Sequence, residues 1–452
     1  MNEDALIFQQ FTEQLEEEAD EEYWEMGAAS LGVIVGGAEI SRQLLKSRET
    51  RQYLTRPELL ENPRIATPWT SLYDSRSDRA YITTMGFDVA TFDFILESGF
   101  VQTWLSTPIP QTDTSRSGDP QPGGRSLDPP GALGLVLHYL SSTMLNVSLQ
   151  QIFALIPATV VRYLDFSLDI LLEVLRRMPD ARIKWLKGGP GGGKFQEYND
   201  LIIVRHPRLI GAFTAIDGLN LPVQTLEDED IENATYNRWL SEHFVSSVLV
   251  FSPKGKNINA IVTSFTDNIL GEIIDAVVNA PGSWHDANVA RPIFERLRTR
   301  TPPGYYLIAD TAFPRGTQSI AGRICTPLKA GQAVRGTPDE IAERMAYDRE
   351  LLSYRQTAEW GNRGLQGAFG CLRVPLPIDN AERQGNLLEI CNRLNNLRTR
   401  RVGINQIRTV YMRYWQDTAE DIDIWQNFEN MLFSDQRKNN RVACFHTYAE
   451  YT

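Results

Sequence analysis

The chain has 452 residues, of which 42% are hydrophobic and 10% aromatic, so we expect two or three structural units with packed cores. No apolar run approaches the ~18 to 20 residues that a membrane span needs, and the first 27 residues, with ten acids and no Lys or Arg, exclude a secretory signal. We therefore expect an intracellular protein. Its four cysteines lack CxxC spacing, which argues against a zinc module or a disulfide framework and favours buried thiols.

The net charge of -12 argues at first against a polyanionic partner. The ten acids of residues 1–27, which we predict to be a disordered head, account for most of it, and the remaining chain carries only -2. Residues 383–413 hold seven arginines against the single acid Glu389. This cluster is a candidate for contacts with DNA phosphates, and a solvated basic helix is the alternative. The candidate DNA-binding residues are Arg393, Arg398, Arg400 and Arg401.

The first half of the chain reads as helical. We predict a helical region over 28–104, a flexible linker over 105–130, which is dense in Pro, Gly, Ser and Asp, and three helices over 131–180. Ser148 can cap the second of these helices and Pro157 suits the first turn of the third, so the pair has helix-turn-helix spacing. A plain three-helix packing unit gives the same pattern. Because basic and acidic residues nearly balance here, any DNA contacts must be few.

A glycine-rich stretch, KGGPGGGKF at 187–195, contains the GxxxxGK pattern of a phosphate-binding loop. Phe195 stands where that loop needs Ser or Thr, and the following FQEYND does not resemble an amphipathic helix. We therefore interpret the stretch as a flexible loop between domains.

Residues 200–415 alternate strand and helix patterns, and residues 416–452 form a tail with little pattern of its own. We predict strands at 209–218, 243–255, 272–282 and 304–310, and helices at 285–299, 339–369 and 382–400. Such an alternation indicates an α/β domain with a mixed sheet flanked by helices. Between the second and third strands lies NINAIVTSFTDNILG (257–271), and its removal would leave a tight turn. We hypothesise that it is an insertion, or a retained intron.

Three acids in this domain are candidate catalytic and metal-binding residues. Asp217 and Asp310 each end a strand, and Glu359 lies on a helix at the edge of its apolar stripe. Taken singly, the two aspartates fit turns or caps, and Glu359 fits surface ion pairs with Arg355 and Arg363. Taken together, two strand-end acids and one helix acid can hold two divalent ions ~3.5 to 4 Å apart, which is the arrangement that cleaves phosphodiesters with water.

Four strings in this order resemble the DDE superfamily endonuclease domain of PIF/Harbinger transposases: AIDGLNLPV, NAPGSWHDANVARP, YYLIADTAFPRG and LLSYRQTAEWGNRGLQGAFGCLRVPL. The family motifs fall on Asp217, Asp310 and Glu359, with Arg355 as the arginine before the glutamate. His285 and Asp286 lie in the family's GxxHD-like element and are possible accessory residues, although this pair also suits a helix cap. The resemblance covers roughly residues 200–415, and the helical region 131–180 is more weakly similar to the family's helix-turn-helix.

The resemblance implies a ribonuclease H-like fold, Mg²⁺ or Mn²⁺ as cofactor, and hydrolytic cleavage of DNA at transposon ends followed by strand transfer. It also implies a nuclear location, a separate Myb-like DNA-binding partner and a homo-oligomer, with no membrane partner. The alternative from another class is a domesticated transposase-derived protein that binds DNA or acts as a scaffold without catalysis. Because all three acids are present in the sequence, we favour the enzyme.

Overall fold

The computed structural model describes residues 53–109, 119–225, 228–238, 240–253, 271–314, 320–329 and 332–403. Thr55–Thr452 form one compact unit, separate from Met1–Leu54. The predicted acidic head (1–27) and tail (416–452) lie outside the described residues, as does most of the hypothesised insertion. Within the described part, no helix combines the length and apolar character that a membrane span requires.

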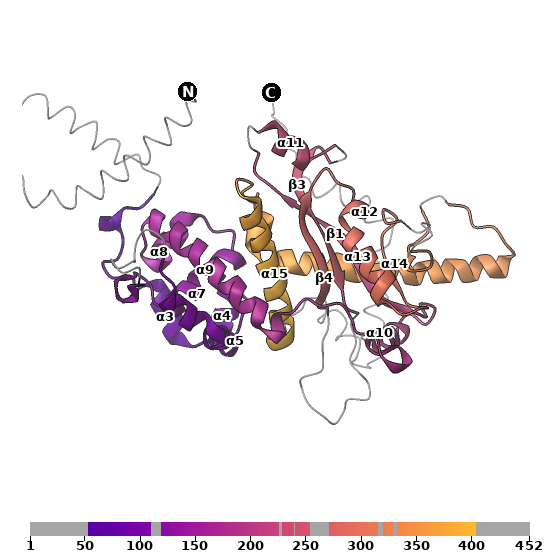
Figure 1. Ribbon diagram of the computed structural model, residues 1–452, viewed down its shortest axis with the longest axis horizontal. Helices are drawn as coiled ribbons and strands as arrows, with labels where there is room; N and C mark the ends of the chain where they lie inside the picture. Colours follow the sequence, from indigo (N-terminus) through magenta and orange to yellow (C-terminus); the bar gives the residue numbers. More distant parts are fainter. Residues whose placement is uncertain are drawn as a thin grey trace, which may run out of the picture. The chain divides into compact units, whose positions relative to one another are not determined.

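The first part of the unit is helical (Figure 1). Several of its helices begin at a side chain that accepts a backbone N–H of the first turn, as Thr67, Ser77, Asp88 and Asp128 do. The helices are α3 (Pro68–Ser75), α4 (Asp78–Met85), α5 (Val89–Ile95), α6 (Val101–Ser106), α7 (Pro129–Ser141), α8 (Asn146–Phe153) and α9 (Pro157–Arg177), with a π turn at Leu96–Phe100 and 3-10 turns at Arg56–Glu58, Pro122–Gly124 and Pro179–Ala181.

Two local expectations for these helices can be compared with the structure. Pro157 is the first residue of α9, as predicted. Ser148 was expected to cap the start of the helix before α9. It instead lies inside that helix, α8, which begins at Asn146. The assignment of these helices as a DNA-binding helix-turn-helix remains a prediction.

The segments on either side of residues 110–118, inside the predicted flexible linker, are packed against the helices. Ile109 and Leu127 are buried. The buried Arg125 guanidinium donates to the backbone oxygens of Trp104 and Thr107 and lies 5.0 Å from the centre of the Trp104 ring. These contacts differ from the flexible linker that the Pro- and Gly-rich composition predicted. The hydrogen bonds of Arg125 hold this part of the segment against the helices.

The second part of the unit is built on a mixed sheet with the order β2-β3-β1-β5-β6, in which β4 also pairs with β3. β1 runs antiparallel to β3 and parallel to β5, where Ala215 faces Ile308. The strands are β1 (Ala212–Pro222), β2 (Tyr236–Asn237), β3 (Glu242–Phe251), β4 (Ile273–Pro281), β5 (Tyr306–Ile308) and β6 (Ile324–Cys325). The predicted mixed sheet flanked by helices is therefore confirmed, and each of the four predicted strands is present.

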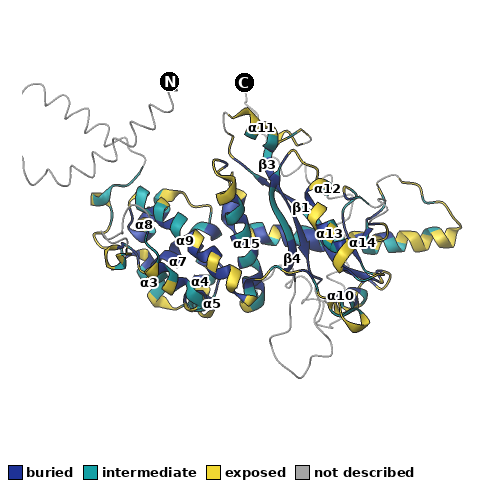
Figure 2. Ribbon diagram, in the orientation of Figure 1, coloured by how far each residue is buried: buried dark blue, intermediate teal, exposed yellow. Residues whose placement is uncertain are grey.

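Helices cover both faces of this sheet (Figures 1 and 2). On one face Ala215 and Leu219 of β1 belong to a core with the long helices, and on the other Ile216 of β1 packs in a second core with Phe195 and Ile293. This alternation follows from the two-residue period of a strand. The first face carries α14 (Pro338–Ala368) and α15 (Ala381–Arg401), and the second carries α10 (Lys194–Ile203), α12 (Asp286–Val289) and α13 (Arg291–Arg300). The remaining elements are α11 (Glu229–Thr235) and 3-10 turns at Pro190–Gly192 and Gly370–Arg373.

The helix α10 was not expected. It begins at Lys194, directly after the glycine-rich stretch, and buries Phe195, Tyr198 and Ile202. The interpretation of FQEYND as non-helical was therefore wrong, because apolar residues beyond that short string complete the buried stripe.

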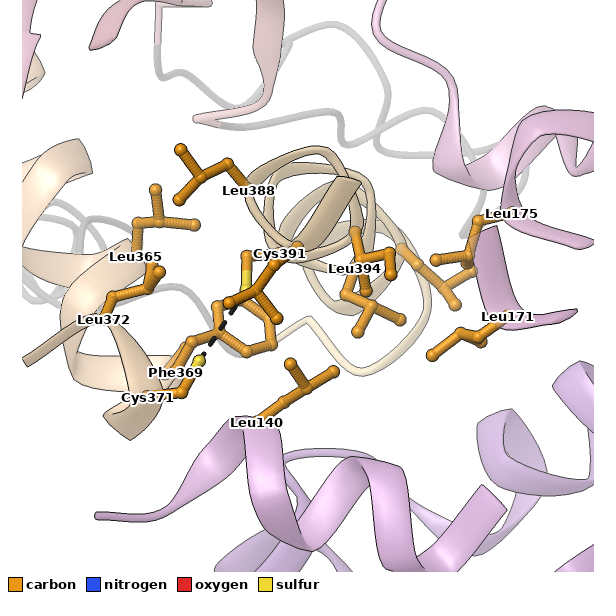
Figure 3. Packing of buried hydrophobic residues seen from close by; sticks show 14 of the residues in the cluster. Leu140, Leu171, Leu175, Leu365, Phe369, Cys371, Leu372, Leu388, Cys391 and Leu394 are labelled. Carbon is orange, nitrogen blue, oxygen red and sulfur yellow. Dashed lines mark hydrogen bonds between the residues drawn. The ribbon is translucent and has the colours of Figure 1, made fainter. Parts of the chain in front are cut away.

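The helix α15 joins the helical part to the sheet in one continuous hydrophobic core. Figure 3 shows its buried side chains between those of α7 and α9 and those near the end of α14. The labelled residues are Leu140, Leu171, Leu175, Leu365, Phe369, Cys371, Leu372, Leu388, Cys391 and Leu394. The sulfur atoms of Cys371 and Cys391 lie 4.0 Å apart as free thiols, which confirms the expectation of buried thiols for these two.

The ends of β3 and β4 meet beside the hypothesised insertion. The Ser252 N–H donates to the Glu272 backbone oxygen over 2.8 Å, and the Glu272 N–H donates to the Ser252 hydroxyl over 2.9 Å. Residues 252 and 272 are thus already joined, as they would be in a tight hairpin.

We predict that replacing residues 253–271 with Asn-Gly leaves the fold intact. A two-residue turn suits the right-handed twist of paired strands and shortens the loop that folding must close. The thermal unfolding midpoint, followed by circular dichroism, should stay within about 3 °C of the parent chain, roughly 1 kcal/mol for a domain of this size. A deletion that unfolds the protein would instead show that the segment belongs to the structure.

Candidate active site

Asp217 lies on the face of β1 that α14 covers. It follows Ala215 and precedes Leu219 on that face, while Ile216 points into the opposite core. In the register with β3 it stands opposite Leu249. A carboxyl group is thereby held among apolar neighbours on a rigid strand in the middle of the sheet.

Asp310 lies at the same level, directly after the neighbouring strand. Ile308, the last residue of β5, is paired in parallel with Ala215; Asp217 lies two residues later within β1, and Asp310 lies two residues beyond the end of β5. Paired strands are about 4.8 Å apart, so the two acids stand side by side on the α14 face. The Thr311 N–H donates to Asp310 Oδ1 over 2.6 Å, which fixes the carboxyl group as the chain leaves the sheet.

Glu359 comes from α14 and is connected to Asp310 through Arg355. The guanidinium of Arg355 contacts Asp310 Oδ1 through Nη1 at 3.1 Å and Glu359 Oε1 through Nη2 at 2.7 Å. The helix ion pair expected for Glu359 thus exists, but the same arginine also reaches the strand acid. The structure brings these two predicted residues together around one positive group.

Electrostatics couple Asp217 to the same cluster. Burial, together with the negative charges of Glu359 and Asp310, raises the pKa of Asp217 to about 7. Arg355 and a backbone hydrogen bond at Gly218 lower this pKa and so act in the opposite direction. Asp217, Asp310 and Glu359 therefore lie within one another's electric fields, with a single arginine offsetting them.

Asp286 is a fourth acid near Asp310, but it approaches β1 from the α12 face of the sheet, opposite to the face of Asp217. A Cβ atom on residue 218 would lie 2.5 Å from Asp286 Oδ2, so only glycine lets this carboxylate approach the strand beside Asp217. Burial raises the pKa of Asp286, as does the charge of Asp310, while His285 lowers it. The exposed His285 ring caps α12 by accepting the Ala287 N–H at 3.4 Å, as the helix-cap alternative expected.

Asn362 is a site residue that the sequence analysis did not identify. Its amide Nδ2 donates to Asp217 Oδ2 over 3.1 Å and to the Gly218 backbone oxygen over 3.0 Å. The available signal was its spacing, because residues three apart on a helix share a face and Asn362 follows Glu359 by three.

The acids offer the hard oxygen ligands that Mg²⁺ and Mn²⁺ prefer. Among the described residues, however, no group of three or more His, Cys, Asp or Glu side chains is spaced to hold a metal ion. The Arg355 guanidinium lies between two of the acids and supplies positive charge there. The chemistry of the donor set fits a divalent ion, but its binding would require Arg355 to leave the acids and the acids to move closer together.

The four arginines proposed for DNA contacts all have partners within the chain. Arg393 pairs with Glu389, Arg400 pairs with Glu272, and Arg401 pairs with Asp180 and lies over the Phe94 ring. The largely buried Arg398 donates to the Gly86 backbone oxygen over 3.0 Å, and its burial lowers its pKa. DNA binding by these residues remains a prediction that would require exchange of these contacts.

Comparison with known families agrees with this geometry. Residues 265–396 match the model of the DDE superfamily endonuclease, a stretch that contains Asp286, Asp310, Arg355 and Glu359 but not Asp217. Neither the curated proteins nor the solved structures contain a match to the chain. The resemblance is thus supported for residues 265–396, which match the DDE superfamily endonuclease model and indicate a nuclease-like or transposase-like domain.

We predict that Asp217→Asn stabilises the metal-free protein above neutral pH. A carboxyl group whose pKa is raised on folding opposes folding once it ionises, so the free energy of unfolding falls as pH rises from about 4 to 7 and stays low above 7. The neutral amide removes this cost, and we expect a gain of about 2 kcal/mol at pH 8 and little change at pH 4. Urea unfolding at both pH values measures it.

The exposed Asp379 provides the matched control, since Asp379→Asn makes the same chemical change away from the cluster. A variant Asp217→Asn that is no more stable than the parent at pH 8 would contradict the electrostatic description of the site.

Proposed function

We propose that this protein is a metal-dependent DNA endonuclease of the transposase type, in which Asp217, Asp310 and Glu359 bind two divalent ions. The observation that carries the proposal is the convergence of acids from β1, from the segment after β5 and from α14 around one guanidinium. Three half-buried acids in one place are costly unless cations offset them. Their presence together therefore favours a binding site over a structural role.

The sheet supports the ribonuclease H-like fold and the PIF/Harbinger assignment that the resemblance implies. Its antiparallel strands β4, β3 and β1 are followed by parallel strands β5 and β6, with one acid on β1 and one directly after β5. The family match begins at residue 265, beyond β1. An insertion at 257–271 separates Asp217 in sequence from the matched residues and accounts for a match that omits its strand.

Each residue then has a defined task in hydrolysis. Bound Mg²⁺ or Mn²⁺ would activate a water molecule and neutralise charge on the phosphate. Asp217, Asp310 and Glu359 would hold the ions, while Asp286 adds negative charge from the other face of the sheet, beside Gly218. Arg355, displaced from the acids, is placed to contact a phosphate oxygen, and its buried Nε has no hydrogen-bond partner among the described residues.

The partners follow from the substrate. The helical region offers few basic residues for DNA, and the α15 arginines are engaged in internal pairs, so we propose that a separate Myb-like protein supplies sequence recognition. Cleavage at two transposon ends would be coordinated by a homo-oligomer. Chromosomal DNA as the substrate would place the protein in the nucleus, where strand transfer could follow cleavage.

One observation favours a second candidate, a domesticated DNA-binding or scaffold protein without catalysis. Arg355 already neutralises part of the acidic cluster, so the fold has a source of positive charge that needs no metal. This alternative predicts DNA binding with intact acids and no cleavage.

We predict that the purified chain nicks supercoiled plasmid DNA with Mg²⁺ or Mn²⁺ and that Asp310→Asn lowers the rate at least 100-fold. The loss follows because one of the ligands that hold and polarise the ions is removed. The rate of conversion to open circles on agarose gels measures it.

Glu343→Gln is the matched control, because it makes the same kind of change on α14 but in a residue that pairs with Arg208. We expect this control to nick at the parental rate. Terminal-repeat binding without nicking by the parent chain would favour the scaffold alternative.

We further predict that Arg355→Gln binds Mn²⁺ about tenfold more tightly in the absence of DNA yet nicks more slowly. Removing the guanidinium frees Asp310 and Glu359 for the ion but also removes the phosphate contact. Isothermal calorimetry and the nicking assay measure the two effects. The exposed Arg363 on the same helix is the control, since Arg363→Gln changes the net charge equally. Weaker Mn²⁺ binding by Arg355→Gln would contradict this role.

A further inference from the structure

Asn362 forms a direct link between the active-site helix and the active-site strand. It lies on α14 and is almost fully buried. Its Nδ2 group donates one hydrogen bond to Asp217 Oδ2 and one to the Gly218 backbone oxygen. The Gly218 backbone oxygen can only accept, so the orientation of the amide with Nδ2 toward the strand is favoured.

This orientation has a cost that a purely structural asparagine does not bear. Asn362 Oδ1 is buried and has no hydrogen-bond partner among the described residues. An unsatisfied buried acceptor costs about 1 to 3 kcal/mol. Asn396 on α15, in contrast, has partners at both ends of its amide. Its Oδ1 accepts the Ile273 N–H, and its Nδ2 donates to the backbone oxygens of Ile273 and Arg182. The position of the Asn362 amide therefore serves the contact with the Asp217 carboxylate and leaves the amide's own oxygen without a hydrogen bond among the described residues.

The contact also determines how Asp217 presents its oxygens. The amide N–H of Asn362 holds Oδ2, and a backbone hydrogen bond at Gly218 also reaches this carboxyl group, so its orientation is fixed from both the helix and the strand. A hydrogen bond to the charged form of a carboxyl group favours that form, which is the form a metal ion requires. Groups that hold a ligand in this way commonly change metal affinity by 10- to 100-fold.

We propose that Asn362 is a positioning residue of the metal site, which fixes the Asp217 carboxylate with one oxygen directed at the cation. This inference rests on the proposed nuclease function. It adds to that function a residue outside the three acids. It also gives the contact of Asn362 on α14 with Asp217 and Gly218 on β1 a role in metal binding.

The test uses the full chain and MnCl₂ in isothermal calorimetry, from pH 6 to 9, with Asn362→Leu, which keeps the side-chain size and removes the amide. The inference predicts at least tenfold weaker Mn²⁺ binding and a higher pH for half-maximal binding, because Asp217 loses a donor to its charged form. If the leucine variant does not fold, Asn362→Ala removes the same amide without adding a methyl group against the carboxylate.

Asn199 on α10 is the matched control. It is equally buried and its Nδ2 also donates to two backbone oxygens, those of Leu209 and Ala212, but it contacts no carboxylate. Asn199→Leu should lower stability without changing Mn²⁺ affinity or its pH dependence. A structural role alone would make the two asparagine variants alike.

The outcomes distinguish failure of this inference from failure of the proposed nuclease function. Loss of Mn²⁺ binding in Asp310→Asn together with parental affinity in Asn362→Leu would overturn the inference and leave the nuclease proposal standing. Equal Mn²⁺ binding by the parent and Asp310→Asn would overturn both. Weakened binding in Asp310→Asn and Asn362→Leu, with Asn199→Leu unchanged, supports both.

Discussion

The close packing of α14 on the sheet is the contact on which the candidate site depends. A Cβ atom on Gly361 would lie 2.6 Å from the Phe251 ring, so glycine lets the helix approach β3. Leu351, Ala358 and Leu365 bury the same side of the helix. With the helix held at this depth, Arg355, Glu359 and Asn362 reach the acids of the strands. A helix set farther out would leave the aspartates alone on the sheet.

The acidic cluster is electrostatically unfavourable, and the packing of the hydrophobic core compensates for this cost. Asp217 and Asp286 are half-buried, and each lies in the field of Asp310. Arg355 offsets part of this repulsion, and the remainder favours a bound cation. The basic residues of α15, in contrast, have a structural role. They are paired with acids of neighbouring segments, such as Glu272 and Asp180, and tie the helical part to the sheet. Charge thus has a structural use on α15 and, in our proposal, a chemical use on α14.

Much of the sheet domain was predictable because its strands and long helices have strong hydrophobic periodicity. The expected strands located Asp217 and Asp310, and the expected helix at 339–369 differs little from α14. The expectation that Asp217 ends its strand was wrong, because β1 continues to Pro222, while Asp310 follows the end of β5. What could not be predicted depends on contacts distant in sequence. Whether an arginine is solvated or paired is invisible in its own segment, so Arg125 and Arg398 became buried where composition predicted a linker and a basic face. The amide of Asn362 likewise has meaning only beside Asp217, 145 residues away.

The central claim is that Asp217, Asp310 and Glu359 share divalent ions. A crystal structure of the protein soaked in MnCl₂, with data collected for anomalous scattering, tests it most directly. The claim predicts anomalous peaks within about 2.0 to 2.4 Å of oxygen atoms from all three carboxylates, with the Arg355 guanidinium moved away from Asp310. Manganese bound elsewhere, with Arg355 still bridging Asp310 and Glu359, would contradict it.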